Sequence, residues 1–190
     1  MTARRGFQLD LAGCTGCKAC QMACKDKHDL GEGVLWRKVV AVEAGTDAYF
    51  VSVACMHCDA PICVEVCPTK AMRQREDGVV FIESTRCIGC GYCAWACPYA
   101  APQYDAAAGV MTKCDLCRDH LELGRPPACV EACPMRVLTL DALPEADDGT
   151  RSTFPLPPAA LTRPRTSLLP HRDVGHAARS DPRIANEEEL

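Results

Sequence analysis

The sequence predicts an α+β fold in which two modules of β-hairpins and short helices are nested, followed by an extended proline-rich C-terminal tail. Three observations support this prediction. Sixteen of the 190 residues are cysteine, and they form four groups of four. The second and third groups repeat a similar pattern at an interval of 30 to 32 residues. The last fifty residues contain seven prolines and no cysteine.

The composition leaves little material for an ordinary hydrophobic core. Aromatic residues make up only 5% of the chain, and the apolar fraction of 48% includes the sixteen cysteines. Metal binding can supply folding free energy directly, because the unfolded chain has no preformed site. We therefore expect cysteine-bound metal to hold much of this fold together.

Every cysteine belongs to one of the four groups. Groups one and three have the spacing C-x2-C-x2-C-x3-C, group two has C-x2-C-x4-C-x3-C, and group four has C-x2-C-x11-C-x3-C. A proline follows the last cysteine of groups two, three and four (Pro68, Pro98 and Pro134). The groups are, in order, Cys14, Cys17, Cys20 and Cys24; Cys55, Cys58, Cys63 and Cys67; Cys87, Cys90, Cys93 and Cys97; and Cys114, Cys117, Cys129 and Cys133.

The spacing of groups one and three is that of bacterial ferredoxins, which hold [4Fe–4S] clusters. Three cysteines wrap around one cluster, and the fourth ligates the other cluster of a pair. We expect the fourth cysteine to begin a helix that points away from the first three. The proline after it is expected to turn the chain out of the site. The sequence thus predicts four [4Fe–4S] clusters.

If the fourth cysteine of each group ligates the cluster of another group, the four groups must form two pairs. Groups two and three predict an inner ferredoxin-like module at residues 55–99. Groups one and four then form an outer module at residues 1–54 plus 100–140. The expected ligand sets are Cys14, Cys17, Cys20 and Cys133 for cluster 1; Cys114, Cys117, Cys129 and Cys24 for cluster 2; Cys55, Cys58, Cys63 and Cys97 for cluster 3; and Cys87, Cys90, Cys93 and Cys67 for cluster 4.

Short strands are expected between the cysteine groups. Alternating apolar residues from position 7 to position 11 predict a half-buried strand. Other apolar segments flank turn signals and predict hairpins. They are residues 39–42 and 49–53 around Gly45, residues 72–82 around Asp77-Gly78, and residues 103–112.

The C-terminal segment, residues 141–190, differs from the rest of the chain. It has one aromatic residue, Phe154, and cannot bury a core of its own. A disordered tail and an extended arm that lies on a partner protein both fit this composition. The apolar and proline residues at positions 154–158 and 168–170 favour the partner-binding arm.

Other uses of clustered cysteines fit less well. Zinc ribbons contain C-x2-C pairs, but they predict isolated pairs mixed with histidine, and the five histidines here have no ligand spacing. Disulfides do not account for the crowded C-x2-C-x2-C runs. His57, between Cys55 and Cys58, is expected to be a hydrogen-bond donor or polar neighbour and not a ligand.

Nothing in the sequence suggests chemistry on an organic substrate or on nucleic acid. No Ser-His-Asp set, paired carboxylates or basic run stands out. Arg4-Arg5 is not followed by the apolar segment of an export signal, and no stretch approaches the ~18 apolar residues of a membrane span. We expect a non-catalytic electron-transfer protein without a signal or membrane span of its own.

The clusters would add negative charge to a chain whose own net charge is −4. A [4Fe–4S] cluster with four thiolates carries about −2, so four would add about −8. Basic residues beside the cysteines are expected to offset part of this charge. They are Lys18, Lys25, Lys70, Arg86, Lys113, Arg118 and Arg136.

Together, the four groups resemble the iron–sulfur B subunits of molybdopterin oxidoreductases of the dimethyl sulfoxide reductase type. The resemblance covers nearly the whole chain. The segments that carry it include Cys14-Thr15-Gly16-Cys17-Lys18, Ala23-Cys24-Lys25-Asp26, Arg75-Glu76-Asp77-Gly78, Cys87-Ile88-Gly89-Cys90, Ala96-Cys97-Pro98-Tyr99, Ala101-Pro102-Gln103-Tyr104 and Met111-Thr112-Lys113-Cys114-Asp115.

This resemblance implies an electron relay in a three-subunit complex. A molybdopterin catalytic subunit with its own cluster would reduce an S-oxide or N-oxide such as dimethyl sulfoxide, and an integral membrane subunit would oxidise quinol. Cluster 1 would face the catalytic subunit and cluster 4 the membrane subunit. Nitrate reductase B subunits, which look similar, have tryptophan where this chain has Cys90 and hold a [3Fe–4S] cluster there, so [4Fe–4S] is expected here.

The resemblance also implies association with a membrane through the partner subunits. The periplasmic face is favoured if a partner carries the export signal, and the cytoplasmic face is the alternative. Polysulfide, thiosulfate and tetrathionate reductase B subunits resemble the sequence as well. A free-standing polyferredoxin is the alternative from another class, and the fifty-residue tail argues against it.

Overall fold

The structure, a computed structural model, describes residues 4–44, 47–143, 156–169 and 183–185, which form short strands and short helices of the predicted α+β class. The strands are β1 (Arg5–Asp10), β2 (Arg37–Ala44), β3 (Asp47–Ala54), β4 (Met72–Gln74), β5 (Val80–Ile82), β6 (Gln103–Asp105), β7 (Val110–Thr112), β8 (Leu138–Ala142), β9 (Thr166–Leu169) and β10 (Arg183–Ile184). The helices are α1 (Ala19–Lys27), α2 (Ile62–Glu65), α3 (Tyr92–Ala96), α4 (Arg118–Glu122) and α5 (Ala128–Glu131), with 3-10 turns η1 (Ser84–Arg86) and η3 (Ala159–Leu161). None of the helices in these residues is long and apolar enough to cross a membrane.

The described strands form two three-stranded sheets and two hairpins. In one sheet, β1 lies between β8, to which it is antiparallel, and β9, to which it is parallel. In the other, β2 and β3 form a long hairpin and β10 pairs with the free edge of β2. The hairpins are β4–β5 and β6–β7. The strands expected at residues 7–11, 39–53, 72–82 and 103–112 are thus confirmed, while the turn at Gly45 lies outside the described residues.

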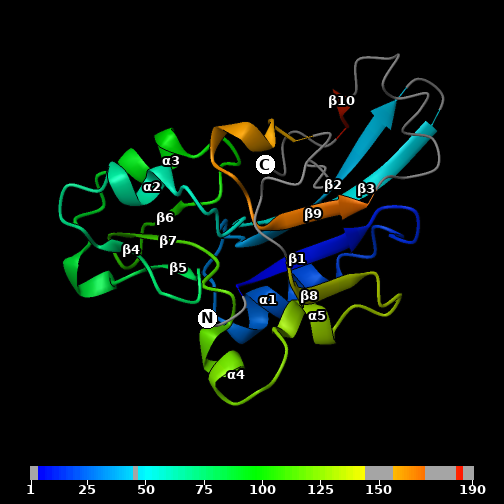
Figure 1. Cartoon of the computed structure of the whole chain (residues 1–190), viewed down its shortest axis with the longest axis horizontal. Helices are drawn as coiled ribbons and strands as arrows, with labels where there is room; N and C mark the ends of the chain where they lie inside the picture. Colours follow the sequence, from blue (N-terminus) through cyan, green and yellow to red (C-terminus); the bar gives the residue numbers. More distant parts are fainter. Residues whose placement is uncertain (1–3, 45–46, 144–155, 170–182, 186–190) are drawn as a thin grey trace.

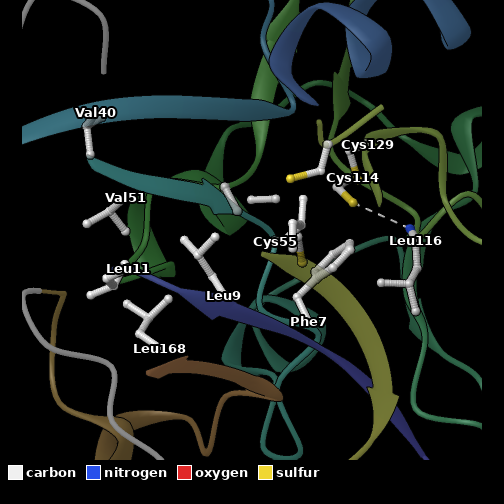
Figure 2. Packing of buried hydrophobic residues seen from close by; sticks show 14 of the residues in the cluster. Phe7, Leu9, Leu11, Val40, Val51, Cys55, Cys114, Leu116, Cys129 and Leu168 are labelled. Carbon is white, nitrogen blue, oxygen red and sulfur yellow. Dashed lines mark hydrogen bonds between the residues drawn. The ribbon is translucent and has the colours of Figure 1, made fainter. Parts of the chain in front are cut away.

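The larger hydrophobic core lies between the β1 sheet and the β2–β3 hairpin (Figure 2). Phe7, Leu9 and Leu11 are each at most 3% exposed, as the alternation of apolar residues predicts. They pack with Val51 of β3 and Leu168 of β9. Four cysteines, Cys55, Cys114, Cys129 and Cys133, are part of the same core, so sulfur atoms fill space that aromatic rings fill in other proteins.

A smaller core joins the two short hairpins, which lie on the same side of the molecule in Figure 1. It contains Met72 and Val80 from the β4–β5 hairpin, Met111 from β7, and Cys93. The β6–β7 hairpin, which the sequence places in the outer module, therefore packs against residues of the inner one. The module boundaries themselves stay a prediction.

Part of the C-terminal segment lies against its own chain, which the sequence does not predict. Arg165, only 1% exposed, donates from Nε to Oδ1 of Asp59 at 2.6 Å. The Arg165 Nη1 atom donates to the carbonyl oxygens of Arg4 and Leu143. These bonds fix the start of β9 beside β1. Phe154 and Pro170 lie outside the described residues, and the partner-binding tail stays a prediction.

We expect Arg165→Ala to release β9 from β1, because it removes the ion pair with Asp59 and the bonds to the carbonyl oxygens of Arg4 and Leu143. The release of β9 is measured as faster amide hydrogen exchange at residues 166–169 of the cluster-loaded chain. Arg163→Ala is the matched control, since Arg163 is two residues away and exposed. Unchanged protection in Arg165→Ala, or equal loss in both variants, would contradict the assigned role of the ion pair.

Candidate metal centres

Short helices carry the last two cysteines of group one and the third cysteine of each other group. Cys20 and Cys24 lie in α1, while the third cysteines of groups two, three and four lie in α2, α3 and α5. The fourth cysteine of each of these three groups follows the end of its helix, at Cys67, Cys97 and Cys133. The expectation that the fourth cysteine begins a helix is therefore wrong.

Proline explains this difference. Proline lacks an N–H group, and its ring disfavours helical backbone at the residue before it. A helix must therefore end at or before the cysteine that precedes Pro68, Pro98 or Pro134. Group one has no proline after its fourth cysteine, and α1 continues past Cys24 to Lys27.

All four groups contain the same unusual backbone turn. The second residue after the first cysteine has a left-handed conformation in each, with φ of 68° at Gly16, 43° at His57, 68° at Gly89 and 65° at Leu116. At Gly16 a Cβ atom would lie 2.5 Å from the ring of Phe50, so glycine is required there. The four groups are thus equivalent in local geometry, although only two have identical spacing.

One pocket is lined by Cys14, Cys17, Cys20 and Cys133. Burial raises the pKa of Cys14, and the nearby charges of Cys20, Cys133 and Cys17 raise it further. The structure thus brings Cys133, from the distant group four, to the first three cysteines of group one. Cys20 Sγ also lies 3.3 Å from the hydroxyl oxygen of Ser52.

The fourth cysteine of group one lies instead beside group four. Burial raises the pKa of Cys24 to about 12, and Cys129 and Cys117 are among the charges that raise it. Burial also raises the pKa of Cys114 well above its usual value, with Cys24 as the strongest charge nearby. Helices α1 and α5, which carry Cys24 and Cys129, pack against each other.

The fourth cysteine of group three lies beside group two. Burial raises the pKa values of Cys58 and Cys63 to about 12, and charges on Cys55 and Cys97 raise both. Cys97, from group three, therefore lies with the first three cysteines of group two.

The fourth cysteine of group two, Cys67, lies beside group three. Burial raises the pKa of Cys93 to about 11, and charges on Cys87 and Cys67 raise it as well. Cys90 lies between Cys87 and Cys93, in the loop that leads into α3.

Hydrogen-bond donors surround the sulfur atoms. Backbone N–H groups of Met72, Met111 and Leu116 point to Cys67, Cys87 and Cys114 at 3.3–3.4 Å (the last is dashed in Figure 2). Such donors favour the thiolate that binds iron. At Cys67, burial acts to raise the pKa, but the Met72 N–H and the Thr69 hydroxyl outweigh it and lower the pKa.

One of these donors comes from the C-terminal segment and is not predicted by the sequence. The Thr162 hydroxyl, from the C-terminal segment, donates to Cys58 Sγ at 3.1 Å. Thr162 is far from the cysteine groups in sequence and belongs to no motif. Only the packing of residues 156–169 on the chain reveals its role.

His57 lies where groups two and four of the cysteines meet. Its Nδ1 accepts the Val80 N–H at 3.1 Å, so the neutral ring carries its proton on Nε2, 3.8 Å from Cys114 Sγ. Burial, followed by the charges of Lys113 and Arg37, holds the pKa of His57 well below its usual value. His57 is thus a neutral hydrogen-bonding neighbour of the cysteines, as expected from its position.

The donor set is the one that holds iron–sulfur clusters, which are bound by cysteine thiolates. All sixteen cysteines are free thiols, and no three His, Cys, Asp or Glu side chains in the described part of the chain are arranged to hold a single metal ion. Zinc would draw four ligands to about 2.0–2.3 Å from one centre. A cubane bonds each thiolate to a different iron, so its ligands stand further apart.

Cluster assembly should depend on pH. The pKa values of Cys24, Cys58 and Cys63 are raised to about 12, so these thiols are protonated at neutral pH without metal. Iron binding must displace those protons. We expect anaerobic reconstitution to release protons and to be at least about tenfold faster at about pH 8.5 than at about pH 6.5. Iron uptake without proton release, or with the opposite pH dependence, would contradict these pKa shifts.

Comparison with known proteins gives two family matches. A 4Fe-4S dicluster domain model matches residues 46–143, and a second 4Fe-4S dicluster domain model matches residues 13–71. Together they span all four cysteine groups, which agrees with the ferredoxin-like modules expected from the spacing.

Curated relatives align along the whole length of this protein. The probable anaerobic dimethyl sulfoxide reductase subunit YnfG of Escherichia coli K12 is 42% identical and the anaerobic dimethyl sulfoxide reductase B subunit of the same organism 40% identical, each over 100% of both sequences. The thiosulfate reductase electron transfer subunit PhsB of Salmonella typhi is 41% identical over 70% of this chain and 73% of its own length. The chain therefore belongs to the family of iron–sulfur B subunits of dimethyl sulfoxide reductase-type molybdopterin oxidoreductases.

Proposed function

We propose that this chain carries four [4Fe–4S] clusters and relays electrons from a membrane subunit that oxidises quinol to a molybdopterin catalytic subunit. That subunit would reduce an S-oxide or N-oxide such as dimethyl sulfoxide. The proposal is supported by sixteen free cysteines in four sequence groups and by the match to an anaerobic dimethyl sulfoxide reductase B subunit over the full length of both chains. When bound, such clusters supply one-electron chemistry. The chain itself is non-catalytic.

The proposed ligand sets are the four crossed sets predicted from the sequence. Their order along the molecule is supported by contacts between successive sets. Arg37 lies beside Cys20 of the first set and Cys24 of the second. Cys114 of the second set lies beside Cys55 of the third. Helices α2 and α3, from the third and fourth sets, are in contact. We propose a single row of clusters, 1 to 4.

Exposed apolar side chains lie at both ends of this row. Ile88, Tyr92 and Trp95, at 65%, 49% and 82% exposure, surround the fourth set. Met22 and Met135, at 57% and 50%, lie beside the first set. Exposed apolar patches often mark binding surfaces. We propose that the fourth set faces the membrane subunit and the first set the catalytic subunit, with the tail adding contacts to a partner.

Similarity to PhsB favours a second candidate, a thiosulfate reductase. Both candidates place the chain in a membrane-associated complex through its partners, on the periplasmic face if the catalytic subunit carries an export signal. Purified complex separates them: quinol-linked reduction of dimethyl sulfoxide supports the first proposal, and of thiosulfate the second. Recovery of the chain alone, with no molybdenum-containing partner, would contradict both.

Metal analysis tests the cluster content directly. The chain reconstituted without partners is expected to contain about sixteen iron and about sixteen acid-labile sulfide, by four times the cubane content. Zinc at several ions per chain, or iron without sulfide, would contradict the proposal. Cys90→Ser is the companion variant, and about four fewer iron are expected because one cubane loses a ligand. Ser84→Ala, an exposed change in η1 shortly before group three, should leave the content unchanged.

A further inference from the structure

Three basic side chains are fully buried in the described part of the chain: Arg37, Lys113 and Arg165, at 1–3% exposure. Asp59 neutralises Arg165 at 2.6 Å. Within the same residues, neither Arg37 nor Lys113 has a carboxylate within 4 Å. A buried charge without a partner is strongly unfavourable, so another negative group must lie close to each.

Arg37, at the start of β2, has spare donors. Its Nη1 donates to the Ser52 hydroxyl at 3.0 Å, and its guanidinium lies 4.3 Å from the centre of the Phe7 ring. The Nε and Nη2 atoms are buried without a hydrogen-bond partner. These two nitrogen atoms carry three N–H groups, which therefore lack an acceptor in a place that water does not reach.

Four cysteines surround Arg37. Burial acts to lower the pKa of Arg37, but negative charge on the neighbouring thiols outweighs it and raises the pKa above its usual value. These neighbours are Cys129, Cys20, Cys114 and Cys24. Cys20 belongs to the first proposed ligand set and the other three to the second. Arg37 thus lies at the junction of the first two sets.

Lys113, directly after β7, lies at the next junction. Its Nζ donates to the carbonyl oxygen of Cys114, in the second set, at 2.9 Å, and to that of Val80. Burial raises the pKa values of Cys63 and Cys97, in the third set, and the charge of Lys113 acts on both in the opposite direction. Lys113 is therefore placed between the second and third sets.

We propose that Arg37 and Lys113 are the buried counter-charges of the clusters, one between clusters 1 and 2 and one between clusters 2 and 3, and that each raises the reduction potential of both clusters beside it. This inference rests on the proposed ligand sets. An added electron makes a cluster more negative, and a nearby positive charge in a low-dielectric interior favours that state. No buried cation lies between the third and fourth sets among the described residues. Cluster 2, beside both cations, depends on them most.

Electron paramagnetic resonance during a redox titration of the assembled complex tests this. Arg37→Gln is expected to shift the reduction equilibria of clusters 1 and 2 about tenfold toward the oxidised state, about 59 mV for one electron. Lys113→Gln is expected to do the same for clusters 2 and 3. Single ligand substitutions assign each signal to its cluster. Cluster 4 should keep its potential in both variants.

Two kinds of control separate charge from packing. Arg118→Gln removes a positive charge next to Cys117, but Arg118 is 44% exposed and paired with Asp115, so solvent screening should leave cluster 2 nearly unchanged. Arg37→Lys and Lys113→Arg keep the charge and should hold all four clusters close to wild-type potentials. If a glutamine variant loses clusters, the two charge-conserving variants still test the proposal. A tenfold shift of a reduction equilibrium in either of them would overturn it.

The inference fails if Arg37→Gln keeps its iron and the potentials of clusters 1 and 2 do not change. It also fails if all four clusters shift equally, since that would indicate a general change of structure. The iron and sulfide content of the wild-type protein shows whether this inference or the proposed function has failed. A wild-type chain with fewer than four clusters contradicts the proposed function, whereas four clusters with unchanged potentials contradict only the role of the two cations.

Discussion

The rest of the structure depends on the burial of cysteine sulfur among apolar side chains. Cys55, Cys114 and Cys129 share one core with Phe7, Leu9 and other apolar residues (Figure 2). Burial favours the neutral thiol, whereas metal binding requires the thiolate. Before a cofactor binds, the interior therefore disfavours the thiolate form that these cysteines need as ligands. Folding and cluster binding are in this sense one process, and this compensates for a chain with few aromatic residues.

The proposed crossing of fourth ligands would join distant parts of this core. Each short helix that bears cysteine carries the third cysteine of a group, and in three groups a proline ends the helix so that the fourth cysteine leaves toward a different set. Contacts between distant segments follow, such as those of α1 with α5 and of α2 with α3. Because the sheets in the described residues have only two or three strands, cross-links through bound clusters would supply much of the long-range order.

The sequence is most informative where structure is local. Cysteine spacing, the alternation at Phe7, Leu9 and Leu11 and the Asp77-Gly78 turn each encode a short-range geometry, and the strands and hairpins expected from such patterns are observed. The expectation that the fourth cysteine begins a helix is wrong because Pro68, Pro98 and Pro134 disfavour helical backbone at the residues before them.

Contacts between residues far apart in the sequence could not be predicted from the sequence. Thr162 and Arg165 act on Cys58 and Asp59 from the far end of the chain, and no local pattern marks them. Among the basic residues near cysteines, sequence spacing identifies Lys113. Arg37 escapes notice because it lies thirteen residues after Cys24 and approaches the cysteines only through the fold.

The central claim is that the fourth ligands cross between groups one and four. Cys133→Ala and Cys14→Ala, compared by electron paramagnetic resonance with Cys114→Ala, test it most directly. Crossed ligands predict that Cys133→Ala and Cys14→Ala lose the same signal and that Cys114→Ala loses a different one. Loss of one shared signal in Cys133→Ala and Cys114→Ala, with that of Cys14→Ala distinct, would contradict the crossed arrangement.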